Sequence, residues 1–155
     1  MARKRLYLCI FYVLVASIAL FATWSQNLSY LNGSFDLSGL ASAYSRFVAE
    51  SRASPAARSV SVDILLLSAA AVGFMIFEAR RLGIRFVWAY VVLGFLLGIS
   101  VTLPLFLITR ERHLAWHEGP ANLNDELEPI PLTDGLGIAA VSAAVVFMSG
   151  FVIAG

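Results

Sequence analysis

Four long apolar runs, separated by polar or charged connections, divide this chain. They cover about residues 6–23, 60–77, 86–108 and 136–154. Each approaches the roughly twenty helical residues that cross a hydrocarbon core of about 30 Å. Because backbone polar groups in lipid must be bonded within their own segment, runs of this length predict helices and not strands. The pattern therefore predicts an all-α fold, in which residues 1–155 form one integral membrane domain, a four-helix transmembrane bundle.

The connection between the first two runs has a helical period of its own. Apolar residues recur at near-helical spacing from Leu37 to Glu50, and Asp36 or Ser38 is available as an amino-terminal cap. Ala53-Ser54-Pro55 then interrupts the pattern. We expect a short amphipathic helix in this first outer loop, lying on the membrane surface.

The composition agrees with a membrane protein, since 59% of the residues are hydrophobic and only 14% are charged. A net charge of +1 gives no broad basic surface, so we expect no nucleic-acid partner. The single cysteine, Cys9, excludes an intrachain disulfide and a thiolate metal cluster. The expected partner is the lipid bilayer, with other membrane proteins or self-association as further possibilities, and no cofactor is expected.

Basic residues in the short connections predict the orientation. One group, Arg3-Lys4-Arg5, precedes the first run, and the other, Arg80, Arg81 and Arg85, lies between the second and third runs. If all four runs cross the membrane, both groups lie on the same side. Because cytoplasmic connections carry the excess of Lys and Arg, this side is predicted to be the cytoplasm. Both termini are then cytoplasmic. The loops 24–59 and 109–135, the second of them acidic, are then predicted to lie outside.

Asp63 and Glu78 are the best candidates for catalytic residues, because carboxylates are costly in a membrane segment. They are fifteen residues apart, about 22 Å along a helix, so they cannot share a proton or a metal ion. Asp63 either bonds outer-loop donors and stabilises a helix start, or handles a proton or cation in a polar cavity. Glu78 is satisfied by an ion pair with Arg81 and with Arg85 nearby. The alternative is catalysis by Glu78, or binding of lipid headgroups together with Arg80 and Arg81.

Small residues four apart predict close helix packing. The pairs are Gly94 with Gly98 and Ala140 with Ala144, and this spacing allows helix backbones to approach closely. We interpret them as contacts within the bundle, with a dimer face as the alternative.

His113 and His117 are weak candidates for metal ligands. Their spacing of four would put both imidazoles on one face of a helix, but the glutamate that follows the first histidine in zinc proteases is missing. We favour an exposed or headgroup-level pair, and no metal site is expected.

Three charged or proline-containing pieces resemble a known family. They are Asp63, Glu78-Ala79-Arg80-Arg81-Leu82-Gly83, and Pro104-Leu105-Phe106-Leu107 followed by Arg110-Glu111-Arg112. Together they resemble a widespread bacterial family of small polytopic membrane proteins that is classed as a domain of unknown function, over about Phe47 to Leu114. The resemblance implies a compact helical protein without an assigned activity, and we expect a multi-pass protein of the bacterial cytoplasmic (inner) membrane.

The functional hypotheses differ in what the carboxylates do. The leading one is a small polytopic inner-membrane protein that acts as a structural or accessory component of a membrane complex. The alternative is a membrane-embedded enzyme that acts on an isoprenoid or lipid substrate, with an intramembrane carboxylate as proton donor. A proton-coupled carrier would need a central acid, which none of the four runs contains. The residues leave catalysis open and favour a protein without it.

Overall fold

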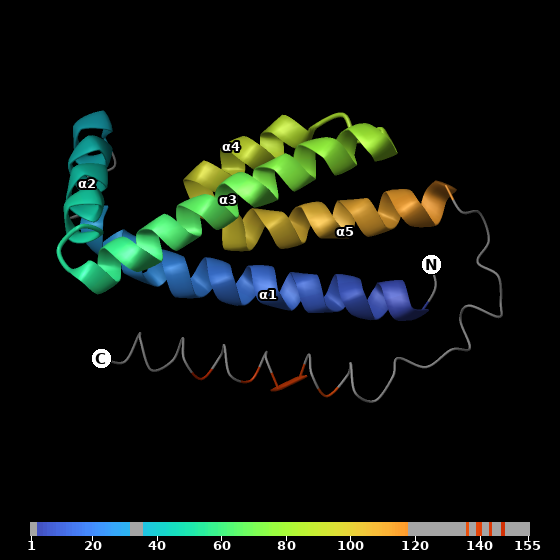
Figure 1. The fold of residues 1–155 in the computed structure, drawn as a ribbon. Helices are drawn as coiled ribbons and strands as arrows, with labels where there is room; N and C mark the ends of the chain where they lie inside the picture. Colours follow the sequence, from blue (N-terminus) through green and yellow to red (C-terminus); the bar gives the residue numbers. More distant parts are fainter. Residues whose placement is uncertain are drawn as a thin grey trace.

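The computed structural model describes residues 3–31 and 36–117, together with Leu136, Ala139, Ala140, Ala143 and Phe147. Within these residues the chain is all-α and has no strand (Figure 1). The elements are α1 (Arg3–Asn27), the 3-10 turn η1 (Leu28–Leu31), α2 (Leu37–Glu50), α3 (Pro55–Leu82), α4 (Val87–Leu97) and α5 (Ile99–His117). The predicted all-α fold is confirmed. The fourth apolar run, 136–154, lies almost wholly outside the described residues, so the four-helix count stays a prediction.

Two of the helices, α1 and α3, are longer than the runs 6–23 and 60–77 that predicted them. The segments Arg5–Tyr30 and Pro55–Leu82 are each long and apolar enough to cross a membrane. Only 6% and 11% of their most apolar windows are buried in the molecule. A core helix of a water-soluble protein would instead be mostly buried, so these two helices need another apolar environment for their surfaces.

Local signals fix both ends of α3. At its start the Ser54 hydroxyl accepts a hydrogen bond from the Ala57 N–H at 3.0 Å, and Pro55 occupies the first turn. At its end Gly83 adopts a left-handed conformation with a φ of 71°. The Ile84 N–H donates to the Ala79 carbonyl at 2.8 Å, which closes the last turn. The chain therefore leaves α3 in a sharp turn and enters α4 after a short connection.

The prediction of one continuous helix over 86–108 is wrong. The chain breaks at Gly98, which has a φ of 105° and a ψ of 143°, a conformation that L side chains rarely adopt. The break reverses the chain, so α4 and α5 lie antiparallel beside each other (Figure 1). The rings of Tyr90 and Phe106, on opposite sides of the turn, meet edge to face with centroids 5.7 Å apart. The third apolar run is thus a helical hairpin.

The two glycines of the third apolar run, Gly94 and Gly98, have different structural roles. At Gly94 an added Cβ would lie 3.1 Å from the Thr102 hydroxyl oxygen, so this glycine lets α4 approach α5 closely. That is the close packing expected of Gly94, and it occurs within the chain. Gly98 does not pack a helix against a neighbour as expected, because it forms the turn between the two helices.

The hairpin also changes where the segment after it lies. Pro104 falls inside α5 and does not end it, and the helix runs on to His117. Residues Thr109–His117 therefore lie at the end of the molecule that holds Arg81 and the start of α1, and not at the end that holds α2 (Figure 1). The described part of 109–135 thus lies at the same end as Arg81, and not at the opposite end as expected, while its side of a membrane stays a prediction. The rest of that loop lies outside the described residues.

A small apolar core joins α3, α4 and α5. Met75 and Phe106 are fully buried in it, and Ala79, Val87 and Val91 pack around them. The side of α5 away from this core packs along α1. The core therefore fixes the hairpin against α3 near the end of the molecule that carries Arg81.

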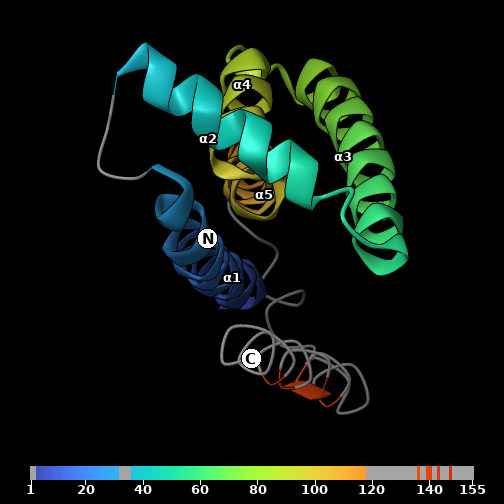
Figure 2. The same cartoon turned by 90° about the vertical axis from the view of Figure 1, so that its left-hand side faces the viewer.

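The amphipathic helix is confirmed with the expected bounds, Leu37–Glu50, and with Asp36 as its cap. The Asp36 carboxylate accepts hydrogen bonds from the Ser38 hydroxyl and, at 3.0 Å, from the Gly39 N–H. These two bonds lower the pKa of Asp36, because they favour its charged form. The helix α2 lies across the end of the other helices (Figures 1 and 2). Its contact with a membrane surface stays a prediction.

Replacing Gly98 tests the hairpin turn. Gly98→Ala is expected to lower the free energy of unfolding by about 1–3 kcal/mol, because alanine is strained at this backbone conformation. The matched control is Gly73→Ala within α3, where an added Cβ meets open space. The control should be neutral or stabilising by up to about 1 kcal/mol. Unfolding in a mild detergent measures both, and equal effects of the two substitutions would contradict the turn.

Candidate functional site

The site begins with Glu78, near the carboxyl end of α3. Its side chain is buried, and the residue is 8% exposed. Arg81, one turn further along the helix, donates a hydrogen bond from Nη2 to Glu78 Oε1 at 2.7 Å. The expected ion pair is therefore present. The Arg81 side chain remains 63% exposed, so most of its guanidinium faces outward.

A second arginine reaches the same carboxylate from α5. Arg110 Nε donates to Glu78 Oε1 at 2.7 Å, and Arg110 Nη1 donates to Glu111 Oε1 at 2.7 Å. Glu78 and Arg110 are 32 residues apart and meet only because the hairpin brings the end of α5 back to the end of α3. We call Glu78, Arg81, Arg110 and Glu111 the ion-pair network. Within it the positive and negative side chains alternate, and their charges balance.

The ion-pair network ties α3 to α5. Glu111 is 7% exposed and lies on α5. The helix α1 packs along α5 and therefore lies beside the α5 side of the network. The network can hold helices together, because a buried carboxylate that binds two guanidiniums is costly to separate from them.

Asp63 lies apart from this network. It is exposed, eight residues after the start of α3, and makes no hydrogen bond or ion pair with the described part of the chain. The outer-loop donors expected for it do not bond to it among these residues. The structure thus separates the two carboxylates, as their spacing on one helix required.

A groove adjoins the network at the same end of the molecule. Its volume is about 570 Å³, and it is lined by Leu82, Gly83, Thr109, Arg112, His113 and Trp116. Thr109 is held in place by a hydrogen bond of 2.7 Å between its hydroxyl and that of Tyr90. Arg112 is exposed and forms no hydrogen bond or ion pair with any residue that the structure describes. The groove therefore combines a guanidinium, an imidazole and an indole.

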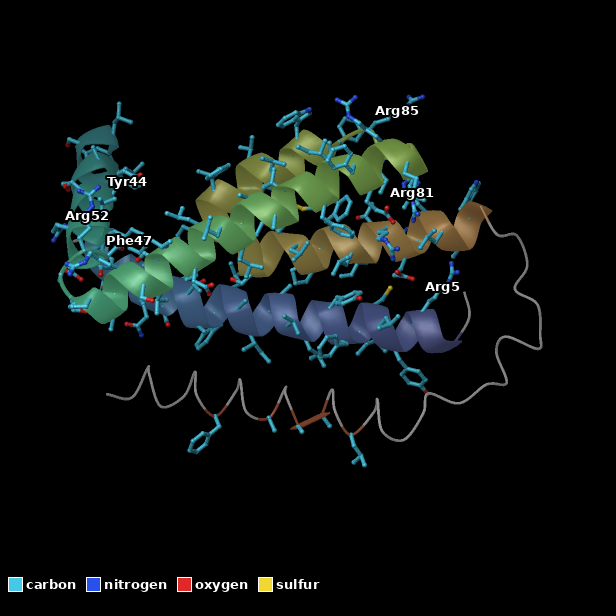
Figure 3. The ribbon with its side chains drawn as sticks, in the orientation of Figure 1. Arg5, Tyr44, Phe47, Arg52, Arg81 and Arg85 are labelled. Carbon is cyan, nitrogen blue, oxygen red and sulfur yellow. The ribbon has the colours of Figure 1, made fainter. Side chains whose placement is uncertain are left out.

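Among the remaining predicted residues that the structure describes, His113 alone belongs to one of these two features. Arg80 and Arg85 are exposed near the groove, and Figure 3 shows Arg85 at the same end as Arg5 and Arg81, opposite Arg52. His113 lines the groove, but the His117 side chain is not among those described, so the histidine pair stays a prediction. In the described ranges no three metal-ligating side chains cluster. Ala140 is exposed, and Ala144 lies outside the described residues.

Sequence reasoning missed Arg110 as the partner of Glu78 and missed Arg112 as part of a groove. One signal was present, because Arg110-Glu111-Arg112 directly follows an apolar run, where charges need partners. It did not identify those partners, because they depend on the direction in which the chain returns.

Residues 11–112 match the family model described as "Protein of unknown function DUF2834". The chain belongs to this family. The resemblance to a domain of unknown function is thereby confirmed, and the match begins well before Phe47. All four residues of the ion-pair network fall inside the DUF2834 segment, whereas His113 and Trp116 of the groove lie just beyond it. Neither a curated protein nor a solved structure matches the chain.

Proposed function

We propose that this DUF2834 member is a multi-pass protein of the bacterial inner membrane that acts as a structural or accessory component of a membrane complex. The observation that carries the proposal is the engagement of Glu78 by arginines from two helices. The acid that a membrane enzyme would need free for proton transfer instead joins α3 to α5. Its charge is used to hold the fold together.

The exposed apolar surface supports placement in a membrane. Large apolar side chains face outward along α1, α3 and α4, and the most exposed include Phe21, Leu65, Leu66, Phe77, Phe95 and Leu96. Soluble monomers rarely expose apolar patches of this extent, which mark contact with lipid or with another protein. Both kinds of contact are part of the proposal.

The distribution of basic residues supports the orientation. Of the eleven Lys and Arg residues, eight lie at the end that holds the network, namely Arg3, Lys4, Arg5, Arg80, Arg81, Arg85, Arg110 and Arg112. Arg46, Arg52 and Arg58 lie toward the other end. By the excess of positive residues on the inner side, the network end is cytoplasmic. The hairpin strengthens this bias, because it brings Arg110 and Arg112 to the inner side.

In this arrangement the hairpin enters and leaves the membrane from the cytoplasmic side. With 11 residues, α4 extends about 16 Å, roughly half of a hydrocarbon core of about 30 Å. Such a segment is tolerated where its turn packs against protein. Among the described helices, α1 and α3 are then the ones that cross.

The geometry gives less support to the alternative, a membrane enzyme with an intramembrane carboxylate as proton donor. Glu78 is bound by two guanidiniums. Asp63 is exposed on the outer part of α3, far from the groove. Neither acid is among the described residues that line the groove.

Purification from membranes tests the accessory role. A tagged chain, cross-linked in intact membranes and extracted in mild detergent, is expected to carry a membrane protein in a fixed ratio. An unrelated tagged membrane protein of similar size is the control bait. Asp63→Asn should leave both the partner and cellular function intact. A monomer without a companion, or conversion of a lipid that requires Asp63 or Glu78, would contradict the proposal.

A further inference from the structure

We infer that the groove between the end of α3 and the end of α5 binds the phosphate of an anionic phospholipid headgroup. The inference rests on the proposed membrane placement. It goes beyond the accessory role, because it assigns a ligand class to residues of α5 that the network does not use.

The charge of the groove favours an anion. Arg112 and His113 line it, and none of the described residues that line it is a carboxylate. The nearest buried carboxylates, Glu78 and Glu111, are both paired with Arg110. Among the described residues the Arg112 guanidinium has no hydrogen-bond or ion-pair partner, and its planar fork of N–H donors matches the oxygens of a phosphate.

The apolar part of the groove favours a lipid over a free phosphate. Leu82 and Trp116 form walls beside Arg112, and Trp116 is 86% exposed. Indole rings favour the headgroup zone of a bilayer, where one side is wet and the other is apolar. A phospholipid carries its phosphate next to apolar chains, and the groove combines a guanidinium with apolar side chains. A phosphate dissolved in water needs no such wall.

Position and size agree with this ligand. The groove lies at the end of α3, where a crossing helix leaves the hydrocarbon core, and Phe86 and Trp88 are exposed close by. Its volume of about 570 Å³ falls within the range of sites for small molecules. Arg80 and Arg81 lie at the same end of the chain and add to the attraction for anionic lipids.

Lipid binding to the full chain tests the inference. The chain is purified in a non-ionic detergent, and its affinity for fluorescent phosphatidylglycerol is measured by competition with unlabelled lipids. Wild type is expected to prefer phosphatidylglycerol to phosphatidylcholine. Arg112→Gln is expected to weaken phosphatidylglycerol binding about tenfold, which corresponds to loss of one charge-assisted contact.

Two matched arginines separate a site from general attraction. Arg85 lies at the same end outside the groove, and Arg52 lies at the opposite end, and both are exposed. Arg85→Gln and Arg52→Gln should each change the affinity less than about twofold, in keeping with the small effect of single exposed charges. A loss at Arg85→Gln equal to that at Arg112→Gln would overturn the groove as the site.

Further measurements distinguish a lipid phosphate from a free phosphate. They also distinguish failure of this inference from failure of the proposed membrane placement. Inorganic phosphate and glycerol phosphate at millimolar concentration should not compete, and competition by them would replace the lipid with a free phosphate. If the wild type resists alkaline extraction from membranes but shows no lipid preference, only this inference fails. Release by alkaline extraction would also overturn the membrane placement. Unchanged thermal unfolding of Arg112→Gln ensures that its lost binding is not misfolding.

Discussion

Arg85→Cys and Trp116→Cys are expected to react with a membrane-impermeant maleimide from the same side of the membrane, and Arg52→Cys from the other side. The reason is the reversal at Gly98, where the φ of 105° sends α5 back toward the end of α3. All three positions are exposed, and Trp116 is 86% exposed. Cys9→Ser provides the cysteine-free background, since Cys9 is the only native cysteine.

The measurement compares spheroplasts with inverted vesicles. Arg85→Cys and Trp116→Cys should be labelled in inverted vesicles and protected in spheroplasts, and Arg52→Cys should show the reverse. Full labelling after detergent solubilisation is the control for reactivity. A single helix over 86–108 would instead group Trp116→Cys with Arg52→Cys. The expected difference is nearly all or none, because a charged reagent does not cross the bilayer.

The parts of the fold that were predictable depend on local signals. The period of α2 and the position of Asp36 lie within one short segment, so both ends of that helix follow from the sequence. The apolar lengths of α1 and α3 are equally local. The turn at Gly98 has no local signal in the sequence, because the residues on both sides are apolar and glycine is common in membrane helices.

The site divides in the same way. Glu78 and Arg81 are three residues apart on one helix, a spacing that indicates an ion pair from the sequence alone. The contact between Glu78 and Arg110 spans 32 residues and requires the hairpin. Because a single helix was predicted over 86–108, this contact was not predicted. The groove depends on the same reversal, since Gly83 and Trp116 line it from opposite sides.

Arg110→Gln is expected to lower the free energy of unfolding by about 2–4 kcal/mol. Removing this guanidinium takes away the cation that the buried carboxylates of Glu78 and Glu111 share. Glu78 then keeps Arg81 as a partner, but breaking a buried ion pair from one side is strongly destabilising. The Arg110 side chain is itself only 26% exposed. The matched control is Arg81→Gln, whose side chain is 63% exposed and whose loss should cost less than about 1 kcal/mol.

A double-mutant cycle isolates the contact itself. Glu78→Gln, Arg110→Gln and the double variant are compared by thermal and denaturant unfolding in the same detergent. The double variant should lose less stability than the two single changes combined, by about 1–2 kcal/mol, because the second change removes a charge that has already lost the interhelical partner. Strict additivity would mean that Glu78 and Arg110 do not interact. A coupling of the expected size would instead show that a charge at the boundary of the apolar run acts between helices, which is the role that the accessory function requires of Glu78.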